Sequence, residues 1–230
     1  MSLTRDLTRP LTRDLTRPAD GSPYERFRNI TAFVPGTPTY IVIPDVVLAG
    51  DFEIKVKLSP SAGSTRIFLN NPSTNAFYLA AQSATSNLIT RHASTSYNGT
   101  VAMTLGEVNS IRVKREGISL KSWVNDSLGT DVTVTTSTQT IGVVGASQGF
   151  SGGFPGEIFD LEIYDNGSLA RRYRLDEDWS STSTAIDSSG NEQHGTATNL
   201  ATTERFGLNI NTAPHQWENA DKSTIIPLAY

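Results

Sequence analysis

The sequence predicts an all-β protein built as a sandwich of two antiparallel sheets. Short segments in which apolar and polar residues alternate recur along most of the chain, and clusters of Gly, Asn, Asp and Ser separate them. No long segment has the apolar periodicity of an amphipathic helix. The chain has 230 residues and no cysteine, so we expect a core large enough to need no disulfide or Cys-based metal site.

The clearest strand pair is predicted at residues 156–175, and we expect the other strands to be built against it. Alternation places two sets of side chains on opposite faces of the first strand: Phe159, Leu161 and Ile163 inward, and Asp160, Glu162 and Tyr164 outward. Asn166 and Gly167 tolerate positive φ and predict a tight turn. A second strand, Leu169–Leu175, returns beside the first.

The remaining strands follow from the same alternation. In chain order they are Thr39–Pro44, Asp51–Leu58, Arg66–Leu69, Ala76–Ala80, Asn87–Arg91, Thr100–Leu105, Ser110–Arg115, Ile118–Asn125, Thr130–Thr136 and Thr140–Val144. The most regular is Asp51–Leu58, with apolar residues at every second position and charged residues between them. Pro44 should close the first strand because proline lacks a backbone donor. Glu116-Gly117 and Asn125-Asp126 supply turns.

The N-terminus carries an internal repeat over residues 3–18, in which Leu-Thr-Arg is followed alternately by Asp and by Pro. Its prolines, Pro10 and Pro18, oppose a helix. In an extended chain the leucines share one side. Two interpretations stay open: a low-complexity tail, or a docking arm that orders on a partner, with leucines in pockets and arginines on carboxylates. The docking residues would be Leu3, Arg5, Leu7, Arg9, Leu11, Arg13, Leu15 and Arg17.

This repeat divides the chain into two expected parts. Residues 1–23 form the arm and a hinge at Ala19–Pro23. Residues 24–230 form the β domain, whose last part, 175–230, is a C-terminal extension.

At this point the order of the motifs resembles the concanavalin A-like, laminin-G-like jelly roll, over roughly residues 33–175. The matching segments are Phe52-Glu53-Ile54, Asn109–Val113, Leu120 with Trp123-Val124-Asn125, Ile141-Gly142, and Gly156–Ile158 with Leu161 and Ile163-Tyr164. The resemblance implies two curved antiparallel sheets, often a calcium site, and often glycan binding on the concave face.

A second resemblance concerns the segment that follows the jelly roll. Tyr173–Glu177, Asp187–Asn191 and His194-Gly195-Thr196 are similar to a motif that usually precedes such domains in bacteria. Here the motif follows the domain, an arrangement that resembles many tailed-phage virion proteins. The N-terminal repeat is likewise similar to segments of phage tail and structural proteins.

Three carboxylates near the central strand need testing for catalysis. The resemblance implies Glu-x-Asp-x-Glu on one strand in related β-glucanases, where the acids share a cleft. Here Glu157, Asp160 and Glu162 are spaced by three and then by two. Glu157 should therefore point away from the other two unless a β-bulge intervenes. We expect solvated strand carboxylates and no enzyme.

Ligand binding is predicted for Tyr164, Asp160, Glu162 and Trp123, because aromatic faces stack on sugar rings and polar neighbours bond the hydroxyls. The alternative for Trp123 is a place in the core. Asp187 and Asn191 offer oxygen ligands for calcium in a tight turn, or they form only a connector. The histidines His92, His194 and His215 have no metal-ligand spacing and are expected to have structural or incidental roles.

The leading functional hypothesis is a non-enzymatic structural component on the exterior of a phage virion. The arm would bind a capsid or tail protein, the lectin-like domain would take a host glycan or decorate the particle, and the chain would form a homo-oligomer, with a trimer favoured. The alternatives are a free or cell-surface carbohydrate-binding module and a polysaccharide-degrading enzyme. A net charge of -4 and the lack of an apolar run of about 20 residues argue against nucleic-acid and membrane partners.

Overall fold

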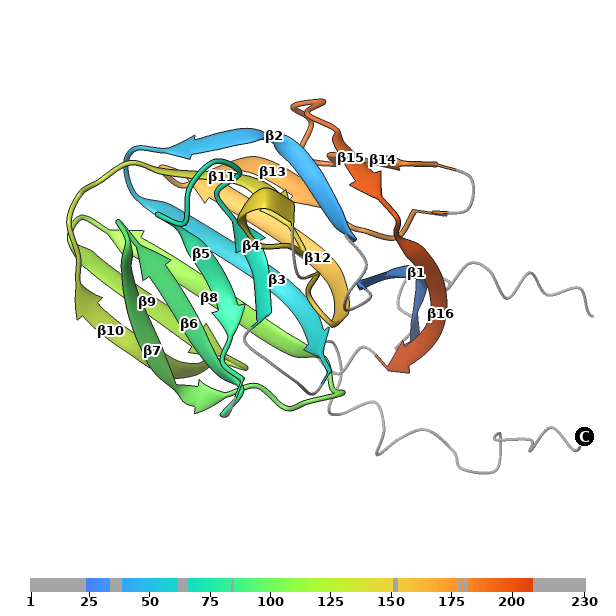
Figure 1. Cartoon of the computed structure of the whole chain (residues 1–230), viewed down its shortest axis with the longest axis horizontal. Helices are drawn as coiled ribbons and strands as arrows, with labels where there is room; N and C mark the ends of the chain where they lie inside the picture. The colour runs from blue at the N-terminus through green and yellow to red at the C-terminus, as the bar shows by residue number, and fades with distance from the viewer. Residues whose placement is uncertain are drawn as a thin grey trace, which may run out of the picture. The chain divides into compact units, whose positions relative to one another are not determined.

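The computed structural model describes residues 24–33, 39–61, 66–83, 85–150, 153–177, 179 and 182–208, which form β-strands, connecting loops and a short 3-10 turn, Gln148–Phe150 (Figure 1). The chain divides into a main unit, residues 28–204, and a second unit made of residues 1–27 and 205–230. The predicted docking arm, its hinge, His215 and Trp217 lie outside the described residues. Within those residues there is no helix of the length and apolarity that crossing a bilayer requires.

The first sheet carries the predicted central hairpin. Its strand order is β10-β9-β8-β3-β12-β1-β16, and β13 pairs with the other end of β12. The strands are β1 (Tyr24–Phe33), β3 (Phe52–Pro60), β8 (Asn109–Glu116), β9 (Ser119–Val124), β10 (Ser127–Thr133), β12 (Gly156–Asp165), β13 (Ser168–Tyr173) and β16 (Ala201–Leu208). Strand β12 thus has β3 along one edge and shares its other edge between β1 and β13.

The second sheet has the order β14-β15-β2-β11-β4-β5-β6-β7. Its strands are β2 (Tyr40–Leu48), β4 (Arg66–Asn70), β5 (Tyr78–Ala81), β6 (Asn87–His92), β7 (Thr95–Ala102), β11 (Gln139–Val144), β14 (Thr184–Ala185) and β15 (Gly195–Thr198). The paired strands for which a register is given are antiparallel in both sheets. The predicted sandwich of two antiparallel sheets is confirmed.

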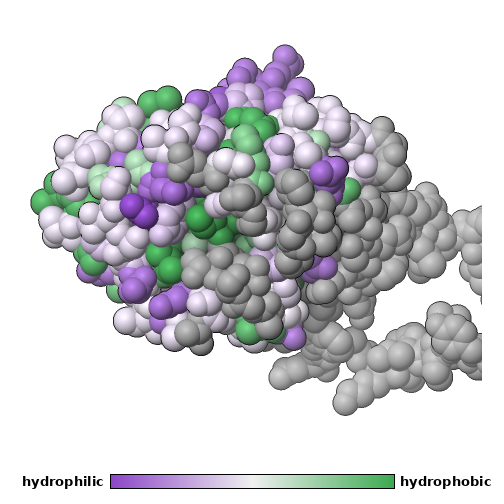
Figure 2. Space-filling view, in the orientation of Figure 1, coloured by the Kyte–Doolittle hydropathy of each residue, from purple (hydrophilic) through white to green (hydrophobic). Residues whose placement is uncertain are grey.

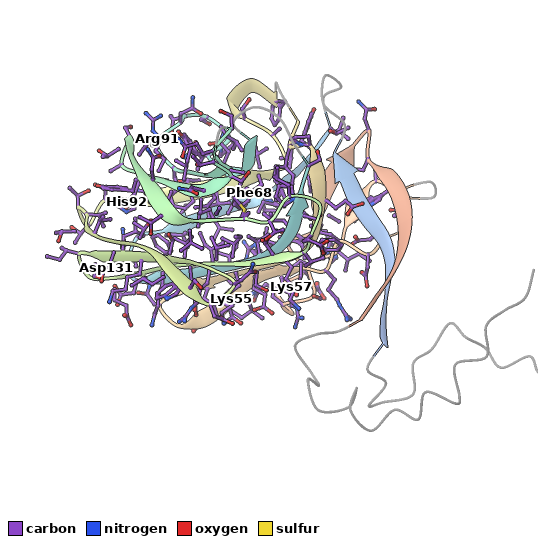
Figure 3. All side chains as sticks on the ribbon, turned by 90° about the horizontal axis from the view of Figure 1, so that it is seen from below. Lys55, Lys57, Phe68, Arg91, His92 and Asp131 are labelled. Carbon is purple, nitrogen blue, oxygen red and sulfur yellow. The ribbon has the colours of Figure 1, made fainter. Side chains whose placement is uncertain are left out.

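The core of the main unit lies between the two sheets. The apolar residues of the predicted strand 51–58 all face it: Phe52, Ile54, Val56 and Leu58 are at most 4% exposed. Phe68 of the second sheet, 1% exposed, also lies between the sheets (Figure 3). Among the described residues, the large apolar side chains that remain exposed are spread over β2, β10 and three loops, and Figure 2 shows hydrophobic surface only in separated patches on the face it displays. Burial of one face per strand therefore fixes which side chains point outward.

Several predicted boundaries need correction. Strand β2 does not end at Pro44 but continues to Leu48. Its pairing with β11 shifts between Val42 and Val46, so the proline falls in a bulge where no ladder donor is needed. Strand β7 begins at Thr95, earlier than alternation indicated. Strands β1, β14, β15 and β16 were not predicted at all.

The predicted tight turns are confirmed. Asn125 and Asp126, between β9 and β10, have φ of 49° and 64°. Asn166 and Gly167, between β12 and β13, have φ of 47° and 79°. Positive φ at both central residues is the conformation that joins two strands with the right twist.

A buried guanidinium joins two loops and the end of β6 at one end of the sandwich. Arg115 is 1% exposed, and it donates hydrogen bonds to the carbonyl oxygens of Ala49, Gly50 and Ser137. It also donates from Nη1 to Nε2 of His92, 3.2 Å away. Because arginine has only donors, His92 must accept through Nε2 and remain neutral.

Burial, reinforced by the charge of Arg115, lowers the pKa of His92 from 6.5 to about 4. Between these values the unfolded chain binds a proton that the folded chain does not. The free energy of unfolding should therefore fall as the pH falls from 6.5 to 4, by at most about 3 kcal/mol from this group. Urea titrations across this range should show a clearly smaller slope in His92→Gln than in the wild type. An equal slope in both proteins would contradict this assignment.

Candidate functional site

A groove of about 640 Å³ lies on the outer face of the first sheet. Its lining residues come from β3, β8, β9, β12, β13 and the β9–β10 turn: Glu53, Lys55, Val56, Lys57, Ser110, Ile111, Arg112, Trp123, Asp126, Asp160, Glu162 and Arg172. Lys55 and Lys57 point away from the core on this side (Figure 3). The structure thus brings together three of the four predicted ligand-binding residues, Trp123, Asp160 and Glu162. Tyr164, two residues beyond Glu162 on β12, contacts this lining residue through its hydroxyl.

The strand register aligns these side chains in rows. One row crosses five strands through directly paired residues: Arg172, Glu162, Lys55, Arg112 and Trp123. A second row, parallel to it, runs through Asp160, Lys57 and Ser110. Directly paired residues share a face of the sheet, so the groove presents a planar array of charged and aromatic groups on a rigid support.

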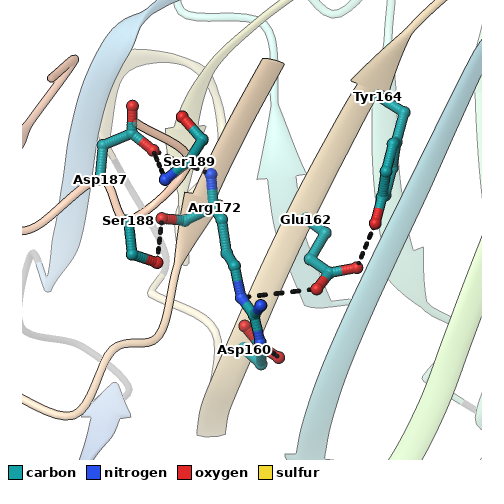
Figure 4. A network of polar contacts seen from close by, with 7 residues as sticks. All are labelled: Asp160, Glu162, Tyr164, Arg172, Asp187, Ser188 and Ser189. Atoms are coloured by element: carbon teal, nitrogen blue, oxygen red, sulfur yellow. Dashed lines mark hydrogen bonds and ion pairs between the residues drawn. The ribbon is translucent and has the colours of Figure 1, made fainter. Parts of the chain in front are cut away.

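Arg172 joins the two groove carboxylates of β12. Its Nη2 lies 3.6 Å from Asp160 Oδ2, and its Nε lies 3.4 Å from Glu162 Oε1. The hydroxyl of Tyr164 donates to the other oxygen of Glu162 at 2.9 Å (Figure 4). This bond raises the pKa of Tyr164, because ionisation would set two negative charges side by side. Both oxygens of Glu162 are therefore engaged by groups of the protein.

Asp160 is less completely satisfied than Glu162. Its Oδ1 is buried and accepts no hydrogen bond from the described part of the chain. Burial raises the pKa of Asp160, and the nearby positive charge of Arg172 only partly offsets that effect. Asp160 therefore carries one buried, unsatisfied oxygen, while the rest of its side chain stays 25% exposed in the groove lining.

The aromatic groups of the groove are held by a second charged cluster. Glu53 pairs with Arg112 Nε through Oε1 and with Lys55 Nζ, 3.6 Å away, through Oε2. Arg112 Cζ lies 4.7 Å from the centroid of the Trp123 ring, and Lys55 Nζ lies 4.7 Å from that of Tyr164. These cation–π contacts fix both rings. Trp123 is half-buried on the outer face of the first sheet. The alternative prediction, which put Trp123 in the core, is therefore wrong.

The loop after β14 supports Arg172 from the outer edge of β13. The carboxylate of Asp187 accepts hydrogen bonds from the backbone N–H groups of Arg172, Ser189 and Gln193 at 3.0, 2.9 and 3.2 Å. Ser188 N donates to Arg172 O at 2.7 Å, and the Ser188 hydroxyl donates to the same oxygen at 3.2 Å (Figure 4). Burial opposes ionisation of Asp187, but the hydrogen bonds to its carboxylate outweigh it and lower its pKa. The loop therefore occupies backbone groups of an edge strand and fixes the backbone from which Arg172 projects.

The predicted calcium ligands are used inside this loop. Asp187 accepts the three N–H bonds just described, and Asn191 donates its side-chain amide to Ala170 O at 2.9 Å. This geometry favours the connector turn over a metal site. Among the residues the structure describes, no group of three or more His, Asp or Glu is placed to hold a metal ion. Calcium binding stays a prediction.

The spacing argument about Glu157 needs correction. A register shift between Ile158 and Asp160 makes a β-bulge at Phe159. Glu157 consequently pairs with Ser59, two residues from Lys57, and lies on the same side of the sheet as the other two acids. It is 9% exposed and is not part of the groove lining. The spacing of the three acids therefore does not exclude catalysis, and the contacts of Asp160 and Glu162 decide what these two carboxylates can do.

Sequence reasoning missed the cations of the groove: Lys55, Lys57, Arg112 and Arg172. Alternation in the strands at 51–58 and 110–115 did place the first three on an outer face. No sequence signal gave the strand order that sets them beside Trp123 and Glu162. Arg172 could be found only from the register of the hairpin, which contains a shift between Ile163 and Tyr164.

Comparison with known proteins gives the fold. No family model matches the chain, and the search of curated proteins gives no match. A candidate carbohydrate-binding protein from Bacteroides ovatus is similar in structure, with TM-score 0.62 and 11% sequence identity over 78% of this chain and 60% of that chain. This chain thus spans 60% of the length of that protein.

Two further solved structures are similar over much of the chain. The heptameric SAP-like pentraxin of Limulus polyphemus has TM-score 0.48 and 14% identity over 80% of this chain and 97% of that chain. Domains LG4-5 of the mouse laminin alpha1 chain have TM-score 0.45 and 9% identity over 74% of this chain and 48% of that chain. The strand order of the two sheets, together with the similarity to the Bacteroides ovatus protein, confirms the predicted jelly-roll sandwich of two antiparallel sheets.

Loss of the Asp187 carboxylate should destabilise the protein. Asp187→Ala leaves three buried or half-buried N–H groups without their acceptor, and we expect a loss of about 2 kcal/mol in the free energy of unfolding. Asp131→Ala is the control, because Asp131 is 52% exposed and only pairs with Lys121; we expect a loss below about 0.5 kcal/mol there. Guanidinium denaturation measures both. Equal losses would show that Asp187 does not hold the loop.

Proposed function

We propose that the chain is a non-catalytic carbohydrate-binding protein whose ligand lies in the groove on the first sheet. The observation that carries this proposal is the half-buried indole of Trp123 beside a planar row of charged hydrogen-bonding groups. An aromatic face packs against the C–H face of a sugar ring, and side-chain donors and acceptors bond the hydroxyls. The similarity to the candidate carbohydrate-binding protein of Bacteroides ovatus supports the proposal.

The predicted binding residues take distinct roles in this proposal. Trp123 is the stacking platform. Asp160, whose side chain is 25% exposed in the groove lining, accepts from a sugar hydroxyl through Oδ2, beside Arg172. Glu162 and Tyr164 bond to each other, and we assign them to shaping that side of the groove. Rigid strands support all four, so little side-chain entropy is lost when a ligand binds.

The contacts of the two acids favour binding over hydrolysis. A glycosidase needs one carboxylate free to attack or to activate water and another free to donate a proton. Here a single arginine contacts both acids, and Glu162 uses its second oxygen on Tyr164. A hydrolase remains the competing hypothesis. It predicts release of reducing ends from a bound polysaccharide, lost in Asp160→Asn.

Removal of the indole should weaken glycan binding without harming the fold. We expect Trp123→Ala to lower affinity at least about tenfold for the glycans that the wild type binds on an array. Tyr78→Ala is the matched control, because Tyr78 carries Arg91 over its ring at 5.4 Å on the second sheet. Titration calorimetry with the best glycan should show normal affinity in the control. Normal affinity in Trp123→Ala would place the ligand elsewhere.

We further propose that the N-terminal repeat anchors the chain to the exterior of a phage particle as a homo-oligomer, with a host glycan as the ligand. The regularity of the repeat supports this hypothesis over an idle tail. A free or cell-surface module is the alternative.

Deletion of residues 1–18 distinguishes the two. In the virion hypothesis the deleted protein keeps its glycan affinity and its fold but is absent from purified particles. Equal incorporation of both forms into particles, or absence of both, would contradict a docking arm. The mass of the full-length protein in solution tests the predicted trimer, and a mass that corresponds only to the monomer would contradict it.

A further inference from the structure

We propose that the groove selects acidic sugars, with the carboxylate of a uronate residue bound by Lys57 and Arg112 while its ring packs on Trp123. This inference rests on the proposed function and adds the chemical class of the ligand. It comes from the distribution of charge and of unused donors in the groove.

The groove is polarised although its charges balance overall. On β12 and β13, Arg172 faces the two carboxylates Asp160 and Glu162, so that cluster carries a net charge of minus one. On β3 and β8, the single carboxylate of Glu53 faces Lys55 and Arg112, so that cluster carries a net charge of plus one. The groove therefore has a negative side on β12 and β13 and a positive side on β3 and β8.

Lys57 makes the positive side stronger. It forms no ion pair with any residue in the described part of the chain. It lies directly between Asp160 and Ser110 in the strand register. Its ammonium carries three donors, and it lines the groove beside the positive cluster.

Arg112 offers a second unused donor group. Only its Nε bonds to Glu53, so both Nη atoms remain without a hydrogen bond to the described residues. The guanidinium lies over the face of the Trp123 ring, so these donors stand beside a sugar ring that packs on the part of the indole that Arg112 leaves uncovered. A carboxylate can accept two parallel N–H bonds from a guanidinium. A uronate ring on Trp123 would then bring its carboxylate to Arg112 and Lys57 together.

Acidic groups limit which anions fit. Asp160 lies on one side of Lys57, and Asp126 lies in the turn that closes the groove beside Ser110. Like charges repel within the groove, so a densely sulfated chain would meet these carboxylates. A uronate flanked by neutral sugar units meets only the positive centre. A wholly neutral glycan leaves Lys57 without an ionic partner and the Nη donors of Arg112 without a carboxylate.

The central comparison is between two forms of one polymer that differ in charge, and two further polymers extend it to other anionic groups. The probes are half methyl-esterified galacturonan, the same polymer fully esterified, hyaluronan, and dextran sulfate. We expect binding of at least one uronate polymer, at least about tenfold weaker binding of the fully esterified polymer, and weak binding of dextran sulfate. Affinity for the uronate polymer should fall as salt rises.

The variant test uses the full chain. Lys57→Gln should weaken uronate binding about tenfold. Lys121→Gln, which removes the same charge from the same sheet outside the groove lining, should change it less than about twofold. Thermal denaturation confirms that both variants fold.

The outcomes separate this inference from the proposed function. Equal affinity for the charged and esterified polymers, or equal effects of the two lysine variants, overturns the acidic-sugar inference. So does binding of neutral glycans alone through Trp123, which leaves the proposed function intact. Stronger binding of dextran sulfate than of either uronate polymer also overturns the inference. Absence of binding to every glycan removes both proposals.

Discussion

The pairing of β12 with β3 is the constraint on which the groove depends. Leu161 and Ile163 are fully buried, and moving either to solvent would cost roughly 1.5–3 kcal/mol. Because strand side chains alternate, a slip of one residue would turn the groove acids into the core. The fixed register instead sets Asp160 opposite Lys57 and Glu162 opposite Lys55. Core packing on one face thus determines the charge pattern on the other.

Two buried polar anchors keep that sheet in place. Arg115 draws loop carbonyls together at one end of β8, and its size and charge make it costly to bury without them. Asp187 holds the loop against β13 through backbone donors. The segment after the hairpin, which sequence reasoning considered as a calcium site, thereby contributes to the position of Arg172.

The fold class and the outward-facing residues of the central strand could be predicted from the sequence, because both follow from local alternation and turn chemistry. Tyr164 and its neighbours were found for that reason, and so was the turn at Asn166. Features that depend on pairing were out of reach. The bulge at Phe159 and the strand that continues past Pro44 arise from register shifts with partner strands. The role of Asp187 depends on backbone donors from a distant segment, which spacing along the chain does not encode.

The central claim is that a glycan occupies the outer face of the first sheet. Nuclear magnetic resonance can test it directly, with the indole N–H signals of the three tryptophans assigned by single Trp→Phe variants. Addition of a glycan that binds on an array should shift the signal of Trp123 and the amide signals of β3 and β8. Shifts confined to β5, β6 and β7 of the second sheet, with the Trp123 signal unmoved, would contradict the account.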